Sequence, residues 1–255
     1  MAKPPPRLFV GDDLREGIQL PLSKEHAHYL GTVLRLVEGS DILLFNGRDG
    51  EWRASIGQLG RKGGEAALLN RTRTQTDLPA ISLWFAPLKK GPTDLVVQKA
   101  TELGVTTIQP VITARTNSDR FKTDRAHTIA TEAAEQSERL DLPDIRDPLP
   151  LAKALAERDG AHLIFCDEAG DDPEERWGGA GGRGQAALLA LQAAPPGPAI
   201  ILIGPEGGFT PEERALVRQS ENSTAISLGA LILKAETAAI TAVALWQAVC
   251  GHARP

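Results

Sequence analysis

The sequence contains very little cysteine. Its 255 residues include two, Cys166 and Cys250, which lie far apart in the chain. So small a number excludes a disulfide-stapled secreted domain, and the spacing provides neither a metal-binding nor a redox pair. His26 and His28 stand two residues apart without further ligands nearby. We therefore predict no metal site.

Long apolar runs and excess positive charge are also lacking. The most apolar segment, Ala235–Val249, is shorter than the roughly 20 residues that span a membrane. The start, MAKPPPRLF, has no apolar stretch typical of a secretory signal, so we expect a cytoplasmic protein without membrane contact. The net charge of −5 excludes a strongly basic protein. Between Lys89 and Arg125, however, seven basic residues face four acidic ones, so any RNA binding depends on local placement.

Hydrophobic patterning divides the chain into two parts. Residues 7 to about 75 show short alternating β segments between glycine-rich turns, with one helix expected at Lys24–Leu34. This pattern predicts a small β-barrel domain over residues 1–75. From residue 79 to 255, strands and helices alternate, which predicts an α/β domain whose parallel sheet is covered on both faces.

The second part has five predicted strands and six predicted helices. The strands are Ile81–Ala86, Thr107–Ile112, His162–Cys166, Ala199–Ile203 and Thr224–Leu228. The helices are Thr93–Leu103, Asp124–Glu138, Leu151–Arg158, Gln185–Ala193, Pro211–Gln219 and Ala235–Val249.

Two loops follow predicted strands and lead into helices. The first is GPEGG, residues 204–208, and Thr210 and Glu213 after it form the sequence pattern of a capping box. The second lies within SLGALILKAETAA, residues 227–239. Ligands bind at the carboxyl ends of strands in such sheets, so the two loops predict two walls of one crevice. The first loop alone is equally typical of an ordinary glycine-rich connection.

Other glycine patterns do not indicate a nucleotide site. Gly179, Gly181 and Gly184 fit a dinucleotide-binding spacing, but no strand leads directly into them. We interpret them as a flexible insertion. No glycine-rich loop is followed by GK[ST], which excludes a P-loop NTPase.

GPEGGF followed by SLG-x-x-IL-x-x-ETA resembles the signature of the RsmE-type methyltransferases of the SPOUT superfamily. Further segments are similar to family motifs in the expected order: HYLGTVLRL, APLKKGPTDLVVQKATELGV, PVITAR and AAEQSERLDLPDI. The resemblance implies S-adenosyl-L-methionine as cofactor and N3 of a uridine in small-subunit (16S) ribosomal RNA as the methylated atom. It also implies a PUA-like N-terminal domain for RNA binding, a trefoil-knotted SPOUT domain and a homodimer.

The candidate cofactor residues surround the two loops and the end of the strand at His162–Cys166. They are Phe165, Cys166, Gly204, Pro205, Glu206, Gly207, Gly208, Leu228, Gly229, Ile232, Leu233 and Thr237. Glycines let a flat ligand approach the backbone, and Gly207 or Gly208 can adopt positive φ. Backbone groups of the second loop suit an adenine.

For catalysis, the uridine N3 proton must leave before or during methyl transfer. Glu236 is the candidate base, although an acid in the first turn of a helix also complements the helix dipole. Lys234 could neutralise a carbonyl oxygen of the base, and Arg115, directly after a strand, is a further candidate. The candidate RNA contacts are Arg7, Arg35, Lys89, Lys90, Lys99, Arg120 and Arg139, chiefly through phosphates.

Four positions depart from the family pattern. Ala230 and Leu231 replace a Pro-Arg pair, Lys234 replaces arginine, and Pro92 stands where a basic residue is common. Lysine does not reproduce arginine's planar fork, so these changes bear on RNA recognition more than on the cofactor. Two alternatives stay open: a SPOUT methyltransferase acting on a different RNA, and a non-catalytic RNA-binding or ribosome-assembly protein.

Overall fold

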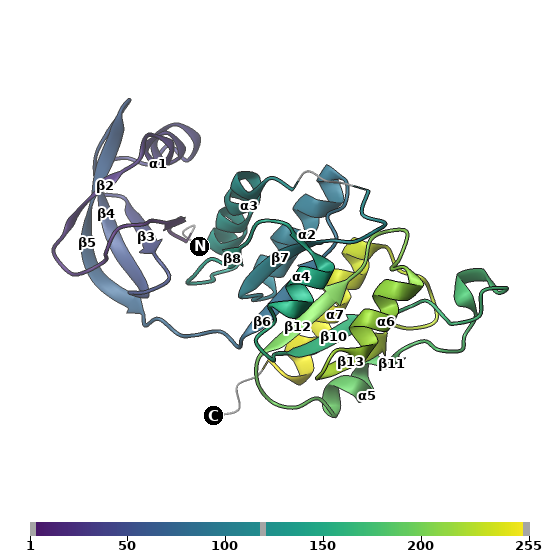
Figure 1. The fold of residues 1–255 in the computed structure, drawn as a ribbon. Coiled ribbons are helices and arrows are strands. Elements are labelled where there is room, and N and C mark those ends of the chain that lie inside the picture. Colours follow the sequence, from purple (N-terminus) through teal and green to yellow (C-terminus); the bar gives the residue numbers. More distant parts are fainter. Residues whose placement is uncertain (1–3, 118–120, 252–255) are drawn as a thin grey trace. The chain divides into compact units, whose positions relative to one another are not determined.

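The computed structural model describes residues 4–117 and 121–251. The chain forms two compact units, whose elements are labelled in Figure 1. The smaller unit holds the chain up to Asp77 together with Thr131–Leu142, and the larger unit holds Leu78–Ala130 and the chain from Pro143 onward. Helix α3 (Thr123–Gln136) thus contributes its first part to the larger unit and its last part to the smaller one.

The smaller unit contains a five-stranded sheet in the order β1-β3-β4-β5-β2. Its strands are β1 (Arg7–Phe9), β2 (Gln19–Leu22), β3 (Asp41–Phe45), β4 (Glu51–Gly60) and β5 (Gly63–Arg73). Alternate side chains such as Leu20, Ile42, Leu44 and Ile56 are buried in one core, as the alternating sequence pattern predicts. The predicted helix is present as α1 (Lys24–His28), followed by the π-helical turn η1 (Tyr29–Val33).

The larger unit contains a parallel sheet in the order β11-β13-β10-β12-β6-β7-β8, with β9 paired to β7. The strands are β6 (Ile81–Phe85), β7 (Thr107–Ile112), β8 (Asp144–Ile145), β9 (Leu149–Pro150), β10 (His162–Cys166), β11 (Gln185–Ala186), β12 (Ala199–Ile203) and β13 (Ser223–Ser227). The other helices are α2 (Lys90–Glu102), α4 (Leu151–Ala156), the 3₁₀ turn η2 (Arg176–Gly178), α5 (Ala187–Gln192), α6 (Pro211–Gln219) and α7 (Ala235–Val249).

Both faces of this sheet are covered. On the central strand β12, Ile201 and Ile203 join the core with side chains of α2, α5 and α7, whereas Ile200 and Leu202 join the core with side chains of α4 and α6. Opposite faces of one strand therefore bury into different cores, which explains why β12 is apolar at every position. The parallel sheet with two covered faces confirms the predicted α/β class. The trefoil knot stays a prediction, because strand order does not define threading.

Four predicted helices need correction. Helix α4 ends at Ala156, two residues before the predicted end at Arg158. The segment Gln185–Ala193 begins as β11, which pairs with β13, and only Ala187–Gln192 is helical. Helix α2 begins at Lys90, three residues before the predicted start. Helix α3 ends at Gln136, and Glu138 beyond it has a φ of 60°, the left-handed conformation that terminates a helix. Across the described residues, no helix has the length and apolar character needed to cross a membrane.

Candidate functional site

The parallel order brings the loops after several strands to one edge of the sheet. β13, β10 and β12 are neighbours, and β6 and β7 follow on the β12 side. Their carboxyl ends lead into the loops that contain Leu228–Lys234, Asp167–Gly184, Gly204–Thr210, Ala86–Lys89 and Thr113–Thr116. This is the edge where open α/β sheets bind ligands.

The glycine loop after β12 is shaped by Phe209. A Cβ at residue 204 would lie 2.6 Å from the Phe209 ring, so only glycine fits there. Phe209 is buried and packs edge-to-face on Phe165, with 5.0 Å between ring centroids. The Phe165 side chain is therefore a support for the loop and does not line its surface. Gly208 has a φ of +68° and donates its N–H to the Pro205 carbonyl at 2.8 Å, which closes a tight turn.

The loop is tied to its surroundings at both sides. Glu213 forms the predicted capping box with Thr210, and its other carboxylate oxygen accepts the Ala114 N–H at 2.7 Å. The Arg115 Nη1 donates to the carbonyl of Gly207 at 2.9 Å. Both contacts join the end of β7 to the glycine loop. The structure therefore places Arg115 in contact with the backbone of the glycine loop, and its role in catalysis stays a prediction.

The loop after β13 carries exposed apolar side chains. Leu231 is 76% exposed and Ile232 is 42% exposed. Gly229 next to them has a φ of +129° and open space around its Cα, so the backbone there is bare. Exposed branched side chains beside bare backbone suit an apolar, flat ligand better than they suit water.

One predicted contact of this loop is already occupied. The Leu228 N–H donates to Glu168 Oε1 at 2.7 Å, so only its carbonyl is open to a ligand. The Ser227 hydroxyl donates to the other Glu168 oxygen at 3.3 Å. Glu168 therefore ties the β13 loop to the β10 loop, a role that no sequence pattern marked.

The start of α7 lies at the same edge. Lys234 and Thr237 are exposed, Glu236 is half-buried in the first turn, and Leu233 packs partly into the core. Cys166 is buried among core side chains, and this burial raises the pKa of its thiol. Cys166 therefore serves as packing at the end of β10 and not as a nucleophile.

A buried ion-pair network holds the loop after β10. Asp167 is 2% exposed and accepts from Arg214 Nε at 2.9 Å and from Arg218 Nη2 at 2.7 Å. Arg214 also donates to the carbonyls of Ala169 and Gly170. Both arginines lie on α6, one turn apart, so α6 fixes this loop. Sequence reasoning missed the network, although arginines four apart in a short helix after the glycine loop were a usable signal.

Two candidate RNA contacts are corrected. The Arg7 side chain is 8% exposed and bonds Glu51 at 2.7 Å. Its other donors reach the carbonyls of Ala134 and Glu135 in the last turn of α3 and of Arg139 beyond it. The Arg139 side chain is 5% exposed and pairs with Asp141 at 2.6 Å. The Arg7 guanidinium closes the end of α3 inside the smaller unit, and the Arg139 guanidinium is buried against Asp141, so neither presents a face to phosphate. Arg139 also lies beyond the end of α3.

The other basic candidates differ in position. Lys89 and Lys90 are exposed where the β6 loop enters α2, at the ligand edge. Lys99 pairs with Glu102 at 2.8 Å near the far end of α2 and is not brought together with them. Arg35 is exposed in the smaller unit with a φ of 58°. Arg120 lies outside the described residues.

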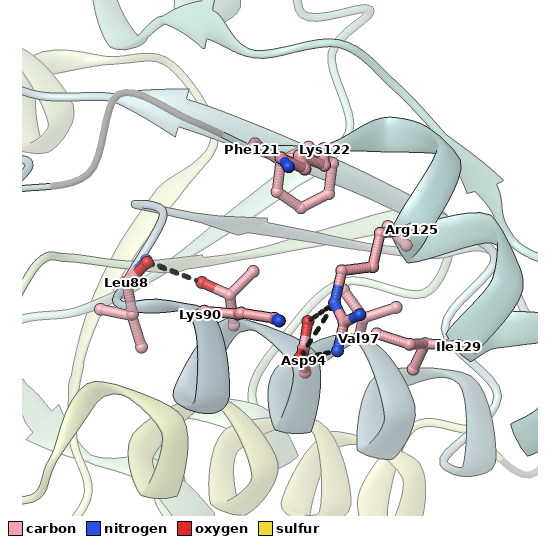
Figure 2. Close-up of a pocket in the computed structure, with 10 residues that line it drawn as sticks. Leu88, Lys90, Asp94, Val97, Phe121, Lys122, Arg125 and Ile129 are labelled. Carbon is pink, nitrogen blue, oxygen red and sulfur yellow. Dashed lines mark hydrogen bonds and ion pairs between the residues drawn. The ribbon is translucent and has the colours of Figure 1, made fainter.

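A pocket of about 320 Å³ lies between the starts of α2 and α3 (Figure 2). None of the candidate cofactor residues lines it. The predicted cofactor residues lie instead at the ends of β10, β12 and β13 and at the start of α7, so the pocket is a separate feature. The described residues contain no cluster of His, Cys, Asp or Glu able to hold a metal ion.

The fold and this edge define a ligand-binding α/β domain joined to a small β domain, and comparison identifies the class. Residues 75–247 match the RNA methyltransferase domain, and residues 22–69 match the RNA methyltransferase PUA domain. The ribosomal RNA small subunit methyltransferase E of Rickettsia conorii is 32% identical over 96% of each chain. The chain belongs to this family of RNA methyltransferases.

Solved structures agree over nearly the full length. A Legionella pneumophila methyltransferase with bound cofactor SAM has a TM-score of 0.83 at 29% identity and covers 98% of this chain and 99% of its own. The ribosomal RNA small subunit methyltransferase E of Neisseria gonorrhoeae, bound to S-adenosyl methionine, has a TM-score of 0.82 at 27% identity and covers 98% and 100%.

Proposed function

We propose that this chain transfers a methyl group from S-adenosyl-L-methionine to N3 of a uridine in small-subunit (16S) ribosomal RNA. The observation that carries the proposal is the meeting of three loops at the ends of the adjacent strands β13, β10 and β12. Two of these loops hold the family's GPEGGF and SLG-x-x-IL segments. The relatives named ribosomal RNA small subunit methyltransferase E match this chain over nearly its whole length.

The residues at this edge fit the cofactor. Bare backbone at Gly208 and Gly229 lets an adenosine lie close to the chain, and Leu231 and Ile232 supply an apolar wall. The remaining candidates would act through backbone or position: Phe165, Cys166, Gly204, Pro205, Glu206, Leu228, Leu233 and Thr237. When bound, the cofactor supplies an electrophilic methyl group.

The chain's own groups then manage the proton and the charge of the base. Glu236 takes the uridine N3 proton, which makes N3 a nucleophile. Lys234, exposed beside it, stabilises the negative charge that develops on the uracil oxygens. Arg115 holds the glycine loop through the Gly207 carbonyl and so positions the reacting groups.

RNA binding in this proposal depends on a few placed cations. Lys89 and Lys90 at the ligand edge contact phosphates, and Arg35 contributes from the PUA-like domain. The net charge of −5 keeps non-specific binding weak. We further propose a cytoplasmic homodimer that acts on the assembled small subunit.

The test is methylation of small ribosomal subunits and of naked 16S rRNA, both from a strain lacking the modification. Mass spectrometry of nucleosides should detect 3-methyluridine only when the chain and S-adenosyl-L-methionine are both present. Methylation elsewhere would favour the alternative of a different RNA. Absence of cofactor binding in calorimetry at millimolar ligand would favour a non-catalytic RNA-binding protein.

A further inference from the structure

The pocket between α2 and α3 has an apolar floor. Leu88, Val97 and Ala126 are buried, and Ile129 and Phe121 are half-buried. Phe121 is held in place by Phe85, with ring centroids 6.2 Å apart at 75°. Figure 2 shows the Phe121 ring across the pocket from α2. A volume of about 320 Å³ is at the lower end of small-ligand sites.

The rim of this pocket is positively charged. It carries Lys90, Lys122 and Arg125 against a single acid, Asp94. The Arg125 guanidinium donates two hydrogen bonds to Asp94, Nε to Oδ1 at 2.9 Å and Nη2 to Oδ2 at 2.6 Å. These bonds hold the pKa of the Asp94 carboxyl below its usual value. The Arg125–Asp94 charges therefore cancel, and the two lysine ammoniums leave the rim with an excess of two positive charges. A polyanion complements such a rim.

The pocket is adjacent to the cofactor edge in the same unit. Leu88 in the wall of the pocket lies two residues after Ala86. The Ala86 N–H donates to the Ile203 carbonyl at 3.1 Å. Ile203 directly precedes Gly204 of the glycine loop. The pocket and the glycine loop are therefore neighbours at this edge, and a nucleic-acid strand that crosses the edge would contact both.

An aromatic wall beneath a cationic rim is the combination that binds single-stranded nucleic acid. We infer that this pocket receives an unstacked nucleobase next to the methylated nucleotide, with the base against Phe121 and its phosphates at Lys90 and Lys122. The inference rests on the proposed function, because it assigns a second contact to the same RNA. Stacking on Phe121 would hold the strand in register while the target uridine enters the cofactor edge.

The test uses the full chain and a short, labelled single-stranded RNA with one uridine, together with copies in which one flanking base at a time is removed. For the wild type, loss of one particular base should weaken binding about 5- to 150-fold, the range expected from stacking. Phe121→Leu should weaken binding of the intact RNA and abolish the further effect of that abasic position. S-adenosyl-L-methionine affinity in calorimetry should be unchanged.

A second variant changes an exposed side chain, so its folding does not depend on core packing. Lys122 is exposed, so Lys122→Glu should fold normally and weaken binding of every RNA to a similar extent. Lys153→Glu, at an exposed lysine outside the pocket, is the matched control and should bind as the wild type does.

Three outcomes would overturn the inference: unchanged RNA affinity in both pocket variants, an abasic effect that persists in Phe121→Leu, or a change in oligomeric state in place of RNA affinity. A wild type that binds RNA through Phe121 but methylates no small subunit would refute the proposed enzyme and support the pocket. A wild type that does not bind the short RNA but methylates small subunits would refute the inference and leave the proposed enzyme standing.

Discussion

Replacing Asp167 by alanine tests how the loop beside the cofactor edge is held. Asp167 is 2% exposed, and its two oxygens accept from Arg214 and Arg218. Asp171 contacts the same two arginines, at 3.0 and 3.4 Å, but is 57% exposed. The two acids therefore share partners and differ in burial, which makes Asp171→Ala the matched control.

The expected magnitudes follow from that difference. Removing one partner of a buried pair costs about 3–5 kcal/mol, because the remaining charge is left uncompensated. Arg214 keeps the carbonyls of Ala169 and Gly170, so we expect the lower end, about 3 kcal/mol. An exposed pair contributes only about 0–1 kcal/mol, so Asp171→Ala should be nearly neutral. For a domain of this size, the Asp167 variant should melt about 6–12 °C lower.

Urea unfolding followed by tryptophan fluorescence measures both variants. In a Trp52→Phe background the remaining tryptophans, Trp84, Trp177 and Trp246, all lie in the larger unit. The signal then reports the unit that contains Asp167. A loss below about 1 kcal/mol for Asp167→Ala, or equal losses for both variants, would refute the anchoring role of the buried network.

The remaining predictions concern the cofactor loops and the core. Gly207→Val should abolish S-adenosyl-L-methionine binding in calorimetry. It should melt near the wild-type temperature, because a Cβ at residue 207 makes only an ordinary 3.5 Å contact with Arg115. Normal cofactor binding would contradict the placement of the cofactor. Glu168→Ala should weaken cofactor binding about 10- to 100-fold, because the Leu228 N–H loses its acceptor. Glu168→Gln keeps an acceptor and should lose less affinity. Equal cofactor affinities in the two variants would argue against this tie. Burial lowers the pKa of His162 below its ordinary 6.5, so the unfolded chain takes up a proton that the folded chain does not. Stability should therefore fall as the pH drops below about 6.5, and less steeply in His162→Gln, as measured by urea unfolding at each pH.

Much of the larger unit was predictable because its strands are buried on both faces. The bounds of β7, β10, β12, α6 and α7 agree with the sequence prediction. Thr210, Pro211 and Glu213 mark the start of α6 through local contacts alone. The two-residue strands β8, β9 and β11 were not predictable, because such short pairings depend on neighbours far away in the chain.

The candidate site also has features that the sequence predicts and features that it does not. Glycines at 204–208 and 229 follow from local conformation, and the family resemblance that they carried is confirmed by the comparisons. The position of Arg7 was not predictable, because the sequence does not show whether an arginine faces RNA or bonds the end of a helix. Its partners are carbonyls of residues 134, 135 and 139, more than 120 positions away, and no local pattern reveals them.

Glu168, Glu213 and Arg115 share one physical task that no sequence pattern indicated, which is to join loops that come from different strands. Glu168 joins the β10 and β13 loops, and Glu213 and Arg115 join the β7 and β12 loops. Each tie is a charge-assisted bond to a backbone group, so it fixes the loop whatever side chain that loop carries. The cost of ordering these loops is therefore met when the chain folds and not when a ligand binds. A rigid edge of this kind explains how Ala230 and Leu231 can differ from the family pattern while the loop keeps its course.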